Sequence, residues 1–315
     1  MSRSFPEYIQ SYFDNLTESS RKASTIKQYV SDLDKFLTWL EDYKDSIELD
    51  ALKSLSDDDY KSYITYLQNA KHSAATIRRL FSVLRGFLTF LNITISFKLD
   101  QAEIEGLREL TAKDFISEDD FKTLLKSMKT KDNADSPLAA ARDQLIDRNV
   151  AIVLLIRYYG LTPKEISMID MANINFPQNT LEIPAEHGQR TFKLIDEHKK
   201  WILDYFNSIP KDRRPRYYKA DPLFVAYNNR YESYQYDHAE AKPKRLSVRA
   251  IQEMIKDEVR RAGLRKLSAV NLRNQCILDA LSFGTPDKSI MDKFNLSGPV
   301  SLFRMKKYLI KKQPS

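Results

Sequence analysis

Residues 147–166 read DRNVAIVLLIRYYGLTPKEI, and this stretch decides how the second half of the chain is interpreted. Its apolar run predicts a buried helix that extends from about Leu138 through Tyr159. After Gly160 the pattern changes to short alternating segments around a turn signal, which is typical of antiparallel strands. The predicted strands are residues 173–176, 181–183 and 192–195.

Helical periodicity lies on both sides of this sheet along the chain. Ser117 and Asp120 form a capping signature ahead of an apolar helix that contains Phe121 and Met128. From His198 onward the pattern is helical again. The second domain is therefore predicted to be α+β with a small antiparallel sheet. Its later helices are expected at about 198–208, 247–262, 270–282, 287–293 and 299–311.

The first part of the chain is organised differently. From Phe5 to about Ile93 apolar residues recur at steps of three and four, which predicts four amphipathic helices in a compact bundle without strands. The periodicity then weakens and charges mix, as in a linker. The sequence thus predicts a mainly α protein with a helical domain at 1–95, a linker at 96–115 and the α+β domain at 116–315.

Composition restricts the class of protein. The chain has 315 residues, of which 42% are hydrophobic and 30% charged, and only 7 glycines, as in a soluble helix-rich protein. Fifty Lys and Arg against 43 Asp and Glu give a formal charge of +7 and a pI near 9.1, which favours a polyanionic partner. A merely soluble surface is the alternative.

Cysteine content and hydropathy indicate the cellular compartment of the protein. The single cysteine, Cys276, excludes an internal disulfide and a cysteine-based zinc site, and we expect it in the core. The sequence shows no apolar signal region and no run of about 18 apolar residues, as a membrane span requires. It predicts a cytoplasmic protein of a bacterial host cell, with no membrane contact and no metal or other cofactor.

Two helices of the first domain open with hydroxyl residues and carry cations in or just after the first turn. A helix N-terminus offers free backbone N–H groups and the positive end of the helix dipole, so these side chains are candidates for phosphate contacts. Ordinary capping with solvated charges is the alternative. The candidates are Thr25, Lys27, Ser73, Thr76, Arg78 and Arg79.

The clearest cluster of cations in the second domain runs from Lys242 to Lys266 and includes Lys244 and Arg245. Ser247 is placed to cap a helix with Arg249 in its first turn, which predicts that this helix enters a DNA groove. A solvated helix face is the alternative. Residue types that make bidentate base contacts occur at Gln28, Arg78, Arg79, Arg85 and Arg249.

Over nearly its whole length the chain resembles the tyrosine recombinase, or phage integrase, family. The resemblance implies a helical core-binding domain and a catalytic-type domain that clamp a DNA duplex from opposite sides. The segments that carry it are Thr25 to Tyr29, Ala75 to Arg85, Asp147-Arg148-Asn149, Tyr159-Gly160-Leu161, Glu165-Ile166, Ile174-Asn175-Phe176, Arg261-Ala262-Gly263-Leu264, Asn271-Leu272-Arg273, and Phe294 to Met305.

The family's strand-cutting chemistry needs a tyrosine nucleophile, two arginines on the scissile phosphate, a hairpin lysine and one or two histidines. The resemblance implies Thr162 in place of the first arginine and His187 in place of the lysine. The hairpin is short, so Arg190 or Lys193 is also expected near the lysine position, and Arg190 is a further candidate for DNA contact. The second arginine is retained as Arg273, which is expected to hold a phosphate as a bidentate contact, with an internal salt bridge as the alternative.

The remaining positions of this chemistry also differ. The resemblance implies Val270 and Leu296 in place of the histidines, and Met305, whose thioether has no proton to lose, in place of the nucleophile. Because such losses raise the barrier by several kcal/mol each, we expect no catalysis. One alternative is an active recombinase that uses Tyr308, and another is an accessory protein of a recombinase.

The sequence therefore predicts a regulator, most simply a transcriptional repressor, that binds double-stranded DNA at operator sites. Degenerate integrase-like proteins of this kind resemble the lysogeny repressors of SPbeta-type Bacillus prophages. Because little chain follows Met305, we expect a monomer or a small oligomer assembled on DNA, with a regulatory protein or peptide as a further partner.

Overall fold

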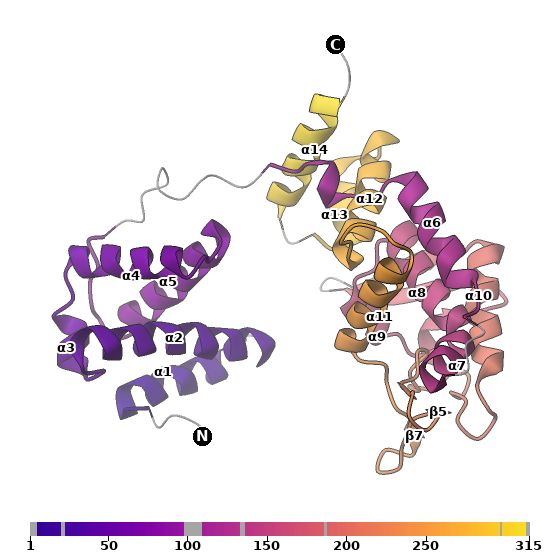
Figure 1. Cartoon of the computed structure of the whole chain (residues 1–315), viewed down its shortest axis with the longest axis horizontal. Helices are drawn as coiled ribbons and strands as arrows, with labels where there is room; N and C mark the ends of the chain where they lie inside the picture. The colour runs from indigo at the N-terminus through magenta and orange to yellow at the C-terminus, as the bar shows by residue number, and fades with distance from the viewer. Residues whose placement is uncertain are drawn as a thin grey trace. The chain divides into compact units, whose positions relative to one another are not determined.

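The computed structural model describes residues 5–19, 23–97, 109–132, 136–185, 188–296 and 298–312 (Figure 1). The chain divides into two compact units, Met1–Arg108 and Glu109–Ser315, and the division falls inside the stretch expected to be a linker. N-terminal to this division, Phe97 is buried in the core of the first unit. C-terminal to this division, Phe115 is buried in the second unit and stacks on Tyr308.

The first unit is a helical bundle, as the periodicity predicts. Its core is rich in aromatic side chains, with Phe36, Tyr63 and Phe87 all but inaccessible to solvent. A short helix of five residues joins the four expected ones, because one turn is too short to show a helical period. The helices are α1 (Glu7–Glu18), α2 (Ala23–Lys44), α3 (Leu49–Lys53), α4 (Asp57–Asn69) and α5 (Ala74–Phe90).

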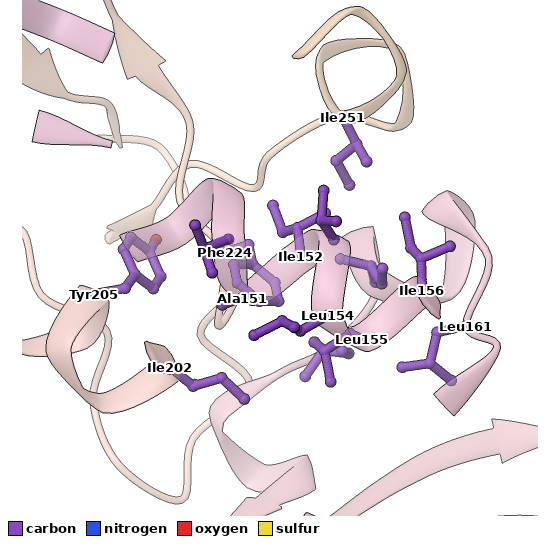
Figure 2. Close-up of a cluster of buried hydrophobic side chains, with 14 of the residues drawn as sticks. Ala151, Ile152, Leu154, Leu155, Ile156, Leu161, Ile202, Tyr205, Phe224 and Ile251 are labelled. Carbon is purple, nitrogen blue, oxygen red and sulfur yellow. The ribbon is translucent and has the colours of Figure 1, made fainter. Parts of the chain in front are cut away.

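The second unit is built around the apolar run of the sequence. The helix expected at 138–159 is two helices, because the backbone leaves helical geometry at Leu145, with φ −103° and ψ 6°. The second of them is buried on every side, which suits its continuous apolar sequence, and Figure 2 shows its Ile152 and Leu155 in the core. The helices here are α6 (Glu118–Lys129), α7 (Pro137–Gln144), α8 (Ile146–Tyr159) and α9 (Pro163–Ser167).

Gly160 ends α8 in a left-handed conformation with φ +67°. A Cβ at this position would lie 2.4 Å from two ring carbons of Phe294. Both the backbone conformation and the close approach of Phe294 therefore require glycine here.

A three-stranded antiparallel sheet follows, as expected, in the order β1 (Ile174–Asn175), β2 (Thr180–Ala185) and β3 (Gly188–Lys193). After α10 (Asp196–Ser208) the chain forms two small hairpins that the sequence did not reveal, because strands of two residues are too short to show alternation. These hairpins pair β4 (Tyr227–Asn228) with β5 (Ser233–Tyr234), and β6 (Tyr236–Asp237) with β7 (Lys242–Pro243).

Four helices complete the second unit, close to their expected bounds: α11 (Val248–Arg261), α12 (Ala269–Ser282), α13 (Asp287–Phe294) and α14 (Pro299–Lys312). The last three enclose an apolar cluster that includes Cys276, Phe294 and Met305. Burial raises the pKa of the Cys276 thiol to about 11, so it stays protonated as a core residue. None of the described helices is long and apolar enough to span a membrane.

Candidate nucleic-acid interface

Thr162, at the position of the expected first arginine, is the N-cap of α9. Its hydroxyl accepts a hydrogen bond from the backbone N–H of Glu165, 3.2 Å away. The Glu165 carboxylate in turn accepts from the N–H and the hydroxyl of Thr162, both at 2.7 Å. This reciprocal capping box fixes the Glu165 side chain at the start of the helix.

Arg190 reaches the same carboxylate from β3. Its guanidinium forms an ion pair with Glu165 and donates a hydrogen bond to the carbonyl oxygen of Lys293 at 2.8 Å. Only 9% of the Arg190 side chain is exposed. Arg190, one of the candidates for DNA contact, is thus held by a carboxylate and a carbonyl of its own chain.

Arg273, on α12, lies beside this pair and donates to the carbonyl oxygen of Phe294. Burial lowers the pKa of its guanidinium, the carboxylate of Glu165 raises it, and the neighbouring Arg190 lowers it further. Arg190 and Arg273 therefore both bind the last carbonyls of α13, where the helix dipole favours cations. The Nε of each arginine is buried and has no hydrogen-bond partner among the described residues.

The other positions implied by the family's chemistry do not gather around Arg273 as a polar site. Met305 is 5% exposed and packs in the apolar cluster of α12 to α14, against which Leu296 also packs. Val270 is 64% exposed on the first turn of α12. His187 lies outside the described residues. Tyr308 stacks on the ring of Phe115 with centroids 4.6 Å apart.

In the first unit, a buried carboxylate of α2 binds an arginine of α5. Asp32 is 1% exposed and accepts hydrogen bonds from Gln28, at 2.8 Å, and from Arg79. Arg79 thus joins α5 to α2, whereas Gln28 is bound within α2. Arg85 likewise donates to the carbonyl oxygen of Phe97 at 3.1 Å.

The remaining candidates of this unit lie near the same helix openings. Ser73 is the N-cap of α5, accepting from the N–H of Thr76 at 3.2 Å, and its hydroxyl is also 2.9 Å from that of Thr76. Lys27 is exposed on the first turn of α2, whereas Thr25 and Arg78 are half-buried. The first turns of α2 and α5 and the residues next to them therefore carry exposed cations and hydroxyls.

In the second unit Ser247 is the predicted N-cap of α11, and accepts from the N–H of Ala250 at 3.1 Å. Lys244 and Arg249 are exposed on either side of this cap, and neither forms an ion pair among the described residues. Arg245 differs, because it pairs with Asp170 and donates to the carbonyl of Ser167 at 2.7 Å.

Most of the cations further along α11 have partners in their own chain. Lys256 pairs with Glu253, Arg260 with Asp257, and Arg261 with Asp132. Within the cation cluster predicted at 242–266, the exposed cations without an ion pair among the described residues are thus Lys244 and Arg249 near the N-terminus of α11 and Lys266 beyond its C-terminus. Exposed cations that the sequence analysis did not single out lie just before this cluster, at Lys211, Lys219 and Arg230.

The described part of the chain contains no group of three or more His, Cys, Asp or Glu residues that could hold a metal ion. What the two units do present is a pair of helix N-termini in the first and a capped, cation-flanked helix N-terminus in the second. Such ends donate backbone N–H groups and attract phosphate. A helical domain followed by an α+β domain with a small antiparallel sheet is the architecture expected of the class of proteins that the sequence resembles.

Comparison with known proteins agrees with this class. Residues 9–92 match the family described as phage integrase, N-terminal SAM-like domain. The chain is 20% identical to the tyrosine recombinase XerC of Roseiflexus sp. (strain RS-1) over 289 residues, which cover 91% of this chain and 84% of the relative.

Two solved structures have the same fold. The integrase of the transposon Tn1549, in complex with transposon right end DNA, matches with a TM-score of 0.67 at 14% identity, covering 98% of each chain. The XerH recombinase, bound to a palindromic difH substrate, matches with a TM-score of 0.66 at 15% identity, covering 91% of this chain and 78% of that one. The first unit thus matches the phage integrase family, and the chain as a whole is similar to tyrosine recombinases in sequence and has their fold.

Proposed function

We propose that this chain is a non-catalytic member of its family that binds double-stranded DNA at specific sites and acts as a transcriptional repressor of a prophage. It binds as a monomer or as a small oligomer assembled on DNA. It requires no cofactor, and a regulatory protein or peptide releases it from its operator.

The observation that carries the absence of catalysis is the environment of Met305 and Thr162. The position implied for the nucleophile holds a thioether packed among apolar side chains, with no proton to give up. At the position implied for the first arginine, a threonine caps a helix instead of offering a cation. Stabilisation of a transition-state phosphate relies on preorganised cations, and here Arg190 is paired with Glu165.

DNA binding requires fewer specific groups than strand cleavage, and the exposed cations of this chain support it. Exposed cations that neutralise phosphates release counterions without requiring in-line geometry or proton transfer. Lys27, Lys244 and Arg249 are such cations, each beside the N-terminus of a helix. The solved relatives named above are complexes with DNA, which favours the same partner here.

Mapping of the sites bound in the source genome tests the proposal. We expect a small number of sites at promoters, and increased transcription from those promoters when the gene is deleted. Binding to these sites should fall steeply as salt rises. A single bound site at a recombination crossover, with no change in transcription on deletion, would contradict the repressor.

An active recombinase that uses Tyr308 is the second candidate, and the activity of the named relatives favours it. Tyr308 lies one turn beyond Met305 on α14. Promoting it to nucleophile leaves Thr162, Val270 and Leu296 unchanged, so the arginine and histidines that assist the family's reaction are still missing. We therefore prefer the non-catalytic function.

A further inference from the structure

The segment between α10 and α11, residues 209–245, is a compact basic arm that includes both small hairpins. It contains nine Lys and Arg against five Asp and Glu, so most of the chain's excess of positive charge lies in this segment. It also contains six of the chain's 17 tyrosines. In Figure 1 its hairpins lie at the end of the second unit opposite α13 and α14.

The base of the arm is fixed to the start of α11. Val225 pairs with Arg245 in an antiparallel bridge, and the N–H of Leu246 donates to the carbonyl of Phe224 at 2.9 Å. The side chains of Phe224, Val225 and Leu246 are buried in the core of the unit. Ser247, the cap of α11, follows directly, so the arm cannot move independently of the opening of this helix.

The two hairpins are joined at this base into one unit. Ala226 donates from its N–H to the carbonyl of Lys244 at 2.8 Å and accepts from the N–H of Gln235 at 2.8 Å. Lys244 in turn donates to the carbonyl of Gln235 at 3.0 Å. The backbone segments at Ala226, Gln235 and Lys244 are thus hydrogen-bonded to one another, and both hairpins begin at this point.

Besides Lys244 at its base, three cations of the arm are exposed and form no ion pair among the described residues: Lys211, Lys219 and Arg230. Two of the carboxylates near the hairpin turns are already occupied. Asp237 accepts from the backbone N–H groups of Ala239 and Glu240, and Glu240 pairs with Lys242. The positive charge of the arm is therefore not neutralised by its own acidic residues.

Exposed tyrosines stand beside these cations. Tyr218 and Tyr231 are 69% and 68% exposed, and the guanidinium of Arg230 lies 5.6 Å from the centroid of the Tyr231 ring. Tyrosine hydroxyls and arginine N–H groups are donors that proteins use to contact phosphate oxygens. The arm therefore fits a phosphodiester backbone.

We propose that the arm is a second DNA-contacting element, which holds the phosphate backbone beside the groove that α11 enters. This rests on the proposed function. Arg230 lies in the turn of the first hairpin, four residues beyond the base at Ala226, and four residues reach at most about 13 Å, against a major groove about 12 Å wide. A hairpin that starts beside the N-terminus of a helix in the groove thus reaches the flanking backbone.

The test compares three variants on a duplex that the wild-type protein selects from a random-sequence library. The first is K211A/K219A/R230A. The second is the charge-preserving K211R/K219R/R230K. The third, K122A/K126A/K288A, removes three exposed lysines from α6 and α13 as a matched control. Affinity is measured across a range of salt, DNA protection by hydroxyl-radical footprinting, and folding by thermal unfolding.

We expect the alanine variant of the arm to bind at least about tenfold more weakly at physiological salt, with a salt slope lower by about 2 to 3, because each phosphate contact contributes about 0.9. Protection at the outer edge of the site should be lost. The charge-preserving variant and the control should resemble wild type, and all variants should unfold at the same temperature.

An arm variant with wild-type slope and footprint would overturn the inference. If Arg249→Ala abolishes binding while the alanine variant of the arm binds like wild type, the proposed function stands and the arm is not used. An arm variant that binds DNA normally but no longer represses in cells would indicate a protein-docking surface and would also overturn it. If the wild-type protein selects no duplex at all, both the function and the arm fail together.

Discussion

Replacing Glu165 with glutamine is expected to destabilise the second unit by about 3–5 kcal/mol, the usual cost of removing one partner from a buried ion pair. The change leaves Arg190, whose side chain is 9% exposed, and the half-buried Arg273 next to each other without a carboxylate. Glutamine keeps the shape of the side chain, so the loss reports the missing charge. Chemical denaturation monitored by circular dichroism measures it.

The physical reason for this loss can be checked separately with anions. If two uncompensated arginines cause it, sulfate or phosphate should restore more stability to Glu165→Gln than to wild type, beyond the effect of ionic strength alone. Glu182→Gln is the matched control, because Glu182 is on the neighbouring strand β2 and its side chain, among the described residues, accepts an exposed hydrogen bond from Gln189 and forms no ion pair. Equal stability of both variants would mean that Glu165 does not hold the arginines.

Replacing Arg249 with alanine is expected to weaken DNA binding by about 1–3 kcal/mol and to lower the salt slope by about 1 if it contacts phosphate. Arg249 is exposed in the first turn of α11, next to the capping Ser247. If it reads a base instead, the loss should depend on the sequence of the site and leave the salt slope unchanged. Titration of selected and mutated duplexes separates the two outcomes.

Arg260→Ala is the control for this prediction. Arg260 lies on the last turn of the same helix, its side chain is 78% exposed, and it pairs with Asp257. Loss of an exposed pair at the far end of the helix should change neither stability nor binding appreciably. Equal losses from Arg249→Ala and Arg260→Ala would show that α11 does not meet DNA end-on.

Local chemistry made much of the fold predictable. The apolar run before Gly160 indicated a buried helix, and α8 is buried on every side. The hydroxyls of Ser73, Ser117 and Ser247 were expected to cap helices, and each accepts a hydrogen bond from the residue three positions later. Caps and periodicity depend on neighbours within a few residues, so the sequence alone displays them.

Ion pairing over long distances in the chain was not predictable. Arg79 meets Asp32 47 residues away, Arg190 meets Glu165 25 residues away, and Arg245 meets Asp170 75 residues away. No sequence pattern distinguishes these arginines from an exposed one such as Arg249. As a result, the sequence overstated how many cations of the predicted interface are available to phosphate.

Tertiary packing also explains how the site differs from its expected form. Arg273 was expected to be available to bind a phosphate. Instead, Arg273 and Arg190 both donate hydrogen bonds to carbonyl oxygens at the C-terminus of α13. Position 165 carries the carboxylate that pairs with Arg190, and only the fold brings strand β3 beside α9. The arm escaped notice because its strands are two residues long, although the run Arg213-Arg214-Pro215-Arg216-Tyr217 is a basic and aromatic signal in the sequence.

The most direct test of the account is an attempt to trap a covalent protein–DNA adduct on nicked suicide substrates built from the sites that the protein binds. A tyrosine recombinase becomes joined to such a substrate through its tyrosine. We predict tight, salt-sensitive binding without any adduct, in wild type and in Tyr308→Phe alike. An adduct that forms with wild type and disappears in Tyr308→Phe would contradict the central claim that this chain grips DNA without cutting it.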